Sequence, residues 1–261
     1  MEKIDLERLQ TWFAGYCRGF FTESTEDNRN FALKEQHSRL VCANMNLLTG
    51  NLALDKNERL TAEAIALFHD VGRFEQYRRY STFRDSMSVN HAALGVRVLA
   101  EERVLETLPE EERRTIFRAV TLHNVFRIPA AVVARELLFT RLIRDADKLD
   151  IWRVFIDYYG LPEEERASAV GLGFPDLPRC SPEVLKCLRQ RNMVQLAAVQ
   201  TLNDFKLLQL SWVFDLNFPA SYRLVLERGC IDALAATLPT NAEVGRAVEE
   251  VRDFVETKVR G

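Results

Sequence analysis

Apolar residues recur at helical spacing along nearly the whole chain, whereas the alternation typical of β-strands is almost absent. The first apolar stripe runs from Leu6 to Phe21 and is followed by a polar loop at residues 22–28. The last part of the chain, residues 182–259, again shows helical spacing. The periodicity therefore predicts an all-α protein, with further helices expected at residues 31–48, 58–70, 91–108, 109–123 and 132–159.

Local signals mark several helix ends. Asn90 is a suitable N-cap for a helix that begins at His91. Pro109, followed by three glutamates, is typical of a helix start. Gly72 is expected to adopt the left-handed conformation just past a helix end. Residues 74–88 are aromatic and charged without a clean period, so we expect a loop there, beside any site formed nearby.

A connector at residues 160–182 divides the helical part of the chain in two. It spans 23 residues and is rich in proline and glycine. Loops of this length often cover a binding site or separate subdomains. We expect a helical core at residues 1–181, with a helical C-terminal extension at residues 182–261 packed on it within one structural domain.

The amino-acid composition gives no sign of a nucleic-acid or membrane partner. The 35 basic residues nearly balance the 38 acidic ones, which leaves a net charge of −3 and no global signature of nucleic-acid binding. No window approaches the roughly 18 to 20 apolar residues of a membrane span, and no secretory signal is visible. The five scattered cysteines lack CxxC spacing and are typical of a reducing compartment. We expect a cytoplasmic protein without a membrane partner.

The pair His69-Asp70 closes an apolar helical segment. A carboxylate without a partner is costly in an apolar setting, and a cation would offset that cost. The other three histidines of the chain, His37, His91 and His123, all lie in or beside expected helices. A later acidic cluster adds further carboxylates, which are Asp145, Asp147 and Asp150.

Imidazole and carboxylate together suit intermediate divalent ions such as Mn, Fe, Co, Ni and Zn, whereas oxygen ligands alone suit Mg. Four imidazoles and two carboxylates exceed the three protein ligands of an ordinary catalytic site. They suffice for two ions if one carboxylate bridges them, because catalytic metal pairs lie roughly 3.5–4 Å apart. The residue types therefore predict a metal site with room for a second ion.

The order His…His-Asp…Asp on consecutive helices resembles the HD superfamily of metal-dependent phosphohydrolases, over residues 30–160. The string Ala-Asp-Lys-Leu-Asp is similar to the closing segment of that family and selects Asp147 among the late carboxylates. The resemblance implies an HD-domain helical bundle and two divalent ions per chain, with Asp70 as the bridge. One ion would be held by His37, His69, Asp70 and Asp147, and the other by Asp70, His91 and His123.

Residues next to the expected ligands are candidates for supporting roles. At 100° per residue, Asp147 and Asp150 share a helix face while Asp145 lies about 200° from Asp147. We therefore expect Asp150 to accept a hydrogen bond from a ligand imidazole. Arg73 follows the His-Asp pair by three residues and could contact a phosphate through two hydrogen bonds. Lys148 adjoins the last ligand, and we expect Asp70, Arg73 and Lys148 to be catalytic.

Three functions are compatible with this ligand set. The first is hydrolysis of a phosphoester in a nucleotide or another small phosphorylated molecule by a metal-activated hydroxide. The second is O₂ activation by a mixed-valent di-iron pair, because myo-inositol oxygenase and the phosphonate-cleaving di-iron oxygenases resemble the same six-ligand arrangement. The third is a non-catalytic metal-binding sensor or interaction module. The ligands alone do not separate the first two, and the sequence leaves the metal, the substrate and the oligomeric state open.

Overall fold

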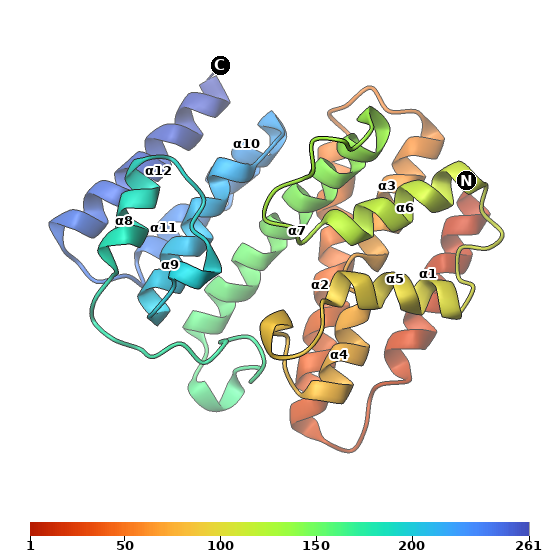
Figure 1. The fold of residues 1–261 in the computed structure, drawn as a ribbon, viewed down its shortest axis with the longest axis horizontal. Helices are drawn as coiled ribbons and strands as arrows, with labels where there is room; N and C mark the ends of the chain where they lie inside the picture. The colour runs from red at the N-terminus through yellow and green to blue at the C-terminus, as the bar shows by residue number, and fades with distance from the viewer. Residues whose placement is uncertain (261) are drawn as a thin grey trace. The chain divides into compact units, whose positions relative to one another are not determined.

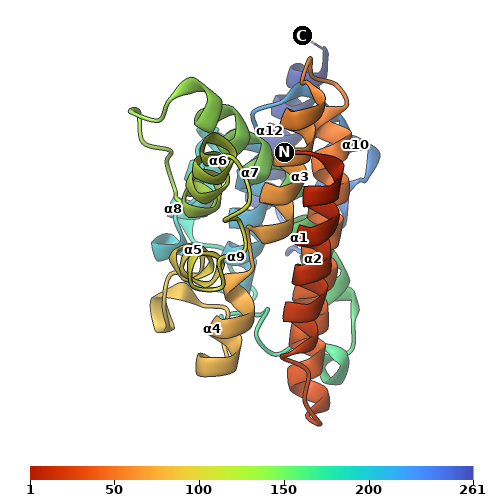
Figure 2. The same ribbon diagram turned by 90° about the vertical axis from the view of Figure 1, so that its right-hand side faces the viewer.

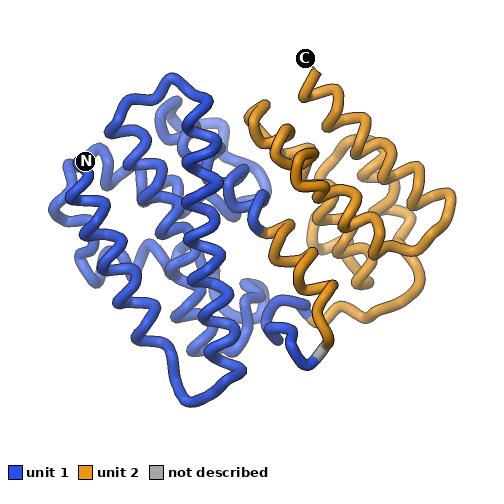
Figure 3. Tube along the Cα trace, turned by 180° about the vertical axis from the view of Figure 1, so that it is seen from behind, with its two compact units in different colours: residues 1–150, 163–172 blue, residues 151–162, 173–261 orange. Residues whose placement is uncertain are grey.

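The computed structural model describes residues 1–260, and these residues form helices joined by turns, with no β-strand among them (Figure 1). The all-α prediction is confirmed. The chain divides into two compact units, one of residues 1–150 and 163–172 and the other of residues 151–162 and 173–261 (Figure 3). The expected division into a core at residues 1–181 and an extension stays a prediction.

The first unit contains the helices that carry every expected metal ligand. Within it α2 packs along α3 and α1 packs on α3, while α4 packs on α5 and α5 on α6 (Figures 1 and 2). This packing brings helix ends that are distant in the sequence to one place. The elements are α1 (Lys3–Arg18), α2 (Thr25–Thr49), α3 (Lys56–Phe68), α4 (Gly72–Tyr80), η1 (Asp85–Met87), α5 (His91–Glu101), α6 (Glu110–Leu122), the first part of α7 (Ala134–Gly160) and η2 (Glu163–Glu165).

The second unit is built from the end of α7 and the later helices. Trp152 is buried and donates from its indole nitrogen to the carbonyl of Gln209 (3.0 Å). The buried carboxylate of Asp204 accepts from the backbone N–H groups of Ser181, Gln200 and Thr201. The elements are α8 (Pro182–Arg189), η3 (Leu196–Ala198), α9 (Leu202–Ser211), η4 (Trp212–Asp215), α10 (Pro219–Glu227), α11 (Cys230–Ala235) and α12 (Ala242–Arg260). Within residues 1–260, none of the helices combines the length and the apolarity needed to cross a bilayer.

Aromatic packing fixes the turn that follows α3. Phe68 directly precedes His69, Phe74 directly follows Arg73, and both rings are fully buried. Phe13 of α1 contacts both of these rings, with centroid distances of 6.3 Å and 6.1 Å. Because buried aromatic rings contribute much of the packing energy of a core, they anchor the turn on both sides.

Two of the predicted helix starts are confirmed. The side chain of Asn90 accepts from the backbone N–H of Ala93 (2.9 Å) and caps α5. Pro109 is the N-cap residue of α6, whose first turn carries three glutamates. The helix expected at residues 91–108 ends earlier, at Glu101, because Arg103 adopts a left-handed φ of 53° and the following residues form turns.

Two local predictions are wrong. The loop predicted at residues 74–88 is found only at residues 81–88, which include η1, because α4 extends to Tyr80 with Phe74 and Tyr77 buried at helical spacing. Gly72 is not in the left-handed region, since it begins α4 and is absent from the positive-φ residues of the described chain. It is needed for a close approach of helices instead. A Cβ at Gly72 would lie 2.2 Å from the carbonyl oxygen of His91 and 2.5 Å from the backbone nitrogen of Gly95.

Candidate metal centre

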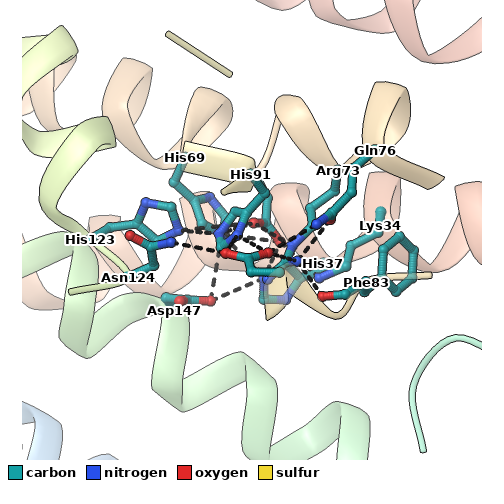
Figure 4. A network of polar contacts seen from close by, with 12 residues as sticks. Lys34, His37, His69, Arg73, Gln76, Phe83, His91, His123, Asn124 and Asp147 are labelled. Carbon is teal, nitrogen blue, oxygen red and sulfur yellow. Dashed lines mark hydrogen bonds and ion pairs between the residues drawn. The ribbon is translucent and has the colours of Figure 1, made fainter. Parts of the chain in front are cut away.

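The structure brings all six expected ligands together (Figure 4). His69 and His123 are the C-cap residues of α3 and α6, and Asp70 lies in the turn before α4. His91 is the first residue of α5, so these four ligands all sit at helix ends. We call the six residues the ligand cluster, which consists of His37 from α2, His69, Asp70, His91, His123 and Asp147 from α7.

One side of the ligand cluster is formed by two histidines and two carboxylates. The Nε2 atoms of His37 and His69 lie 3.2 Å apart. Oδ1 of Asp147 lies 3.1 Å from Nε2 of His37 and 3.5 Å from Nε2 of His69. Oδ2 of Asp70 lies 3.6 Å and 3.9 Å from the same two nitrogens. These four side chains converge on one point.

The other side is formed by His91, His123 and the second oxygen of Asp70. The Nε2 atoms of the two histidines lie 3.0 Å apart. Oδ1 of Asp70 lies 3.3 Å from Nε2 of His91 and 3.9 Å from Nε2 of His123. Asp70 therefore turns one oxygen toward each pair of histidines, which is the geometry of a bridging carboxylate.

The outer nitrogen of each histidine is held by an acceptor. Nδ1 of His69 donates to the carbonyl of Ala66 (2.8 Å), and Nδ1 of His123 donates to the carbonyl of Val120 (2.7 Å). Both acceptors are last-turn helix carbonyls that lack a partner within the helix. Since a carbonyl only accepts, each of these imidazoles carries its proton on Nδ1 and presents the Nε2 lone pair inward.

The other two histidines are held by carboxylates. Nδ1 of His37 donates to Oδ2 of Asp150 (2.7 Å), so the expected hydrogen bond from a ligand imidazole to Asp150 is confirmed. Nδ1 of His91 donates to Asp85, with distances of 2.9 Å and 2.8 Å to its two oxygens. A carboxylate behind an imidazole orients the ring and makes it a stronger metal ligand.

The protonation states also suit a metal. Burial lowers the pKa of His123 to about 3, and the neighbouring His91 and His69 act in the same direction, so His123 is neutral at pH 7. Burial would raise the pKa of Asp70, but the charges of Lys34 and Arg73 outweigh it and hold that pKa well below its usual range. At neutral pH His123 therefore offers a neutral imidazole and Asp70 an ionised carboxylate.

Two observations indicate that the ligand cluster fits divalent ions. Oδ1 of Asp147 is buried without a hydrogen-bond partner in the described part of the chain, and a buried polar atom of this kind is costly. The paired Nε2 atoms present lone pairs to each other at 3.2 Å and 3.0 Å, which is favourable only with a proton or a cation between them. Mixed nitrogen and oxygen donors suit Mn, Fe, Co, Ni or Zn.

Arg73 lies beside the ligand cluster but binds protein groups. Its Nε donates to Oδ1 of Asp70 (3.3 Å). Its Nη1 donates to Oε1 of Gln76 (2.8 Å), to the carbonyl of Phe83 (2.5 Å) and to Oδ1 of Asp85 (2.9 Å). A two-point contact with phosphate would have to replace these bonds. The structure therefore places Arg73 where it orients Asp70 and Asp85.

Lys148 directly follows Asp147 on α7 and is buried. It is 9% exposed, and its Nζ donates to the carbonyl of Arg144 one turn earlier on α7 (3.4 Å). Arg144 in turn donates to the carbonyls of His123 (3.0 Å) and Val125, which secures the turn after α6. The catalytic role of Lys148 stays a prediction.

Two residues of the site were missed from the sequence. Lys34 lies on α2, and its Nζ contacts Oδ2 of Asp70 (2.7 Å). Asp85 accepts from His91 and Arg73 and also from the side chains of Gln76 (2.9 Å) and Asn124 (3.3 Å). Lys34 precedes His37 by three residues on one helix face, but that spacing does not distinguish it from a lysine that faces solvent.

The segment that carries the ligand cluster matches a known family model. Residues 35–152 match the family model of the HD domain. The matched segment contains all six residues of the ligand cluster. Comparisons with curated proteins and with solved structures gave no match.

Proposed function

We propose that this protein is a phosphohydrolase that cleaves a phosphoester, because residues 35–152 match the HD domain, which is the domain of a metal-dependent hydrolase superfamily. Its substrate would be a nucleotide or another small phosphorylated molecule. The observation that carries the proposal is the two-sided placement of Asp70, whose oxygens each face a pair of histidines, within a segment that matches the HD domain. Two metal sites joined by one carboxylate are typical of phosphoester hydrolysis.

In this proposal each side of the ligand cluster would hold one divalent ion, and Asp70 would contribute to both sites. When bound, the ions supply Lewis acidity and a hydroxide nucleophile at neutral pH. One ion would be held by His37, His69, Asp147 and Oδ2 of Asp70, and the other by His91, His123 and Oδ1 of Asp70.

The chain's own groups prepare this site. Ala66, Val120, Asp85 and Asp150 fix the histidine rings through Nδ1, so the Nε2 lone pairs need no reorientation when a metal binds. Burial of the ligand cluster limits access of bulk water, which strengthens the electrostatic interactions inside it.

The test is turnover of simple phosphoesters by metal-loaded protein. We expect manganese-loaded protein to release p-nitrophenol from p-nitrophenyl phosphate or from bis(p-nitrophenyl) phosphate. Asp147→Asn should lower this rate by roughly a hundredfold or more, because a neutral amide binds the metal that stabilises the transition state less tightly than a carboxylate does. Asp232→Asn is the matched control, since Asp232 is 72% exposed and pairs with Arg252 on the surface.

Two outcomes would contradict the proposal. One is the absence of phosphoester turnover with every divalent ion tried, together with a tightly held mixed-valent iron pair that consumes O₂, which would identify an oxygenase. The other is full activity in Asp147→Asn, which would place the chemistry outside the ligand cluster.

A further inference from the structure

Lys34 is a largely covered cation at the edge of the ligand cluster. It lies on α2 three residues before His37, and 14% of its side chain is exposed. Its Nζ lies 2.7 Å from Oδ2 of Asp70 and 5.0 Å from the ring centroid of Phe83 (Figure 4). The ammonium is therefore held beside the proposed bridging carboxylate, against an aromatic face.

Lys34 and Arg73 both contact Asp70 but differ in the number of hydrogen bonds that they donate to protein acceptors. Arg73 donates to four acceptors through Nε and Nη1. Lys34 carries three ammonium hydrogens, and within residues 1–260 Asp70 is the one acceptor that it contacts. Lys34 thus retains donors for a further anion, whereas Nε and Nη1 of Arg73 are committed to the protein.

The position of Lys34 favours an anion at the metal sites. The oxygen that it contacts, Oδ2 of Asp70, is the oxygen that faces His37 and His69. An anion bound on this side lies within reach of the flexible lysine stem. Metal ions bound to Asp70 would neutralise part of the negative charge of its carboxylate. The Lys34 ammonium would then be stabilised more strongly by a second anion.

We propose that Lys34 binds a phosphoryl oxygen of the substrate, an inference that rests on the proposed phosphohydrolase function. Arg73 then acts as a positioning residue for Asp70 and Asp85. A charge-assisted hydrogen bond from an ammonium to a phosphate oxygen is among the strong hydrogen bonds of proteins. Its strength increases where water is partly excluded, as it is beside Phe83.

The experiment is calorimetric titration of inorganic phosphate into manganese-loaded protein, with the metal content of each sample measured. We expect Lys34→Met to weaken phosphate binding roughly tenfold or more at unchanged metal content, the effect of one charge-assisted hydrogen bond. Lys34→Arg should recover part of the affinity because it restores the charge. Lys56→Met is the matched control, because Lys56 is 73% exposed and pairs with Glu2.

Equal phosphate affinity in the wild type and in Lys34→Met, at equal metal content, would overturn the inference. The inference would also be overturned if Lys34→Met bound less phosphate only because it bound less metal, with the same phosphate affinity per metal-loaded chain. Lys34 would then only balance the charge of Asp70. Failure of the proposed function has a different signature. Phosphate binding that depends on Lys34, without hydrolysis of any phosphoester, would contradict the function and leave the inference standing.

Discussion

Replacement of Asp70 by asparagine is expected to release both metal ions and to lower phosphoester turnover by roughly a thousandfold or more. An amide offers one oxygen, so it cannot face the two histidine pairs as the carboxylate does. Metal ions supply several kcal/mol to such a transition state, and each 1.36 kcal/mol is about tenfold in rate. The measurements are metal content and initial rate on the same preparation.

The same substitution should also destabilise the metal-free protein. Lys34 and Arg73 would lose the carboxylate that they share, and we expect a cost of about 1–3 kcal/mol in the free energy of unfolding. Asp232→Asn serves again as the exposed control. Asp70→Asn protein that kept two ions per chain would show that Asp70 is not the bridge.

Replacement of Gly72 by alanine is expected to destabilise the first unit and to weaken the ligand cluster. The added Cβ would lie 2.2 Å from the carbonyl oxygen of His91, a backbone atom that cannot rotate away. The backbones of α4 and α5 must separate, which we expect to cost about 1–3 kcal/mol or more by overpacking. Because His91 begins α5, the same shift moves a metal ligand.

Urea unfolding and metal content measure the two effects of Gly72→Ala. Gly15→Ala is a matched control, because Gly15 lies inside α1 and a Cβ there has no neighbour within 4 Å. This control should gain about 0.5–1 kcal/mol from helix propensity. A Gly72→Ala variant as stable as the wild type, with its metal content unchanged, would show that the two helices tolerate separation.

The residues of the ligand cluster could be predicted from the sequence because their types are rare and their chemistry is restrictive. The chain has four histidines, and all four fall in the ligand cluster. His69 follows an apolar helical segment and His123 an amphipathic one, so their position at helix ends was visible in the periodicity. Asp147 and Asp150 are three residues apart and share a helix face. That spacing likewise predicted that Asp150 accepts a hydrogen bond from a histidine of the ligand cluster, which is His37.

The supporting residues depend on tertiary packing that the sequence does not encode locally. A lysine on a helix face has the same local pattern whether it meets solvent or, like Lys34, a carboxylate from another turn. Asp85 contacts His91 because of the conformation of the irregular segment between α4 and α5. The apolar spacing that predicts a helix could not be recognised in α4, because two of its buried residues, Glu75 and Gln76, are polar.

The position of Gly72 shows how a local rule can be overridden. A glycine after an apolar helix fits the left-handed C-cap pattern, and that pattern predicted a helix end. In the structure, the absence of a side chain at Gly72 instead allows the backbones of α4 and α5 to approach closely. Such a contact depends on a partner more than twenty residues later in the chain, Gly95, which no local pattern reveals.

The metal-to-protein ratio of manganese-loaded protein tests the central claim, that Asp70 joins two metal sites, most directly. We expect two ions per chain in the wild type and one ion per chain in the double variant His91→Ala/His123→Ala, because that variant keeps His37, His69, Asp70 and Asp147. One ion in the wild type, or two ions in the double variant, would contradict the account.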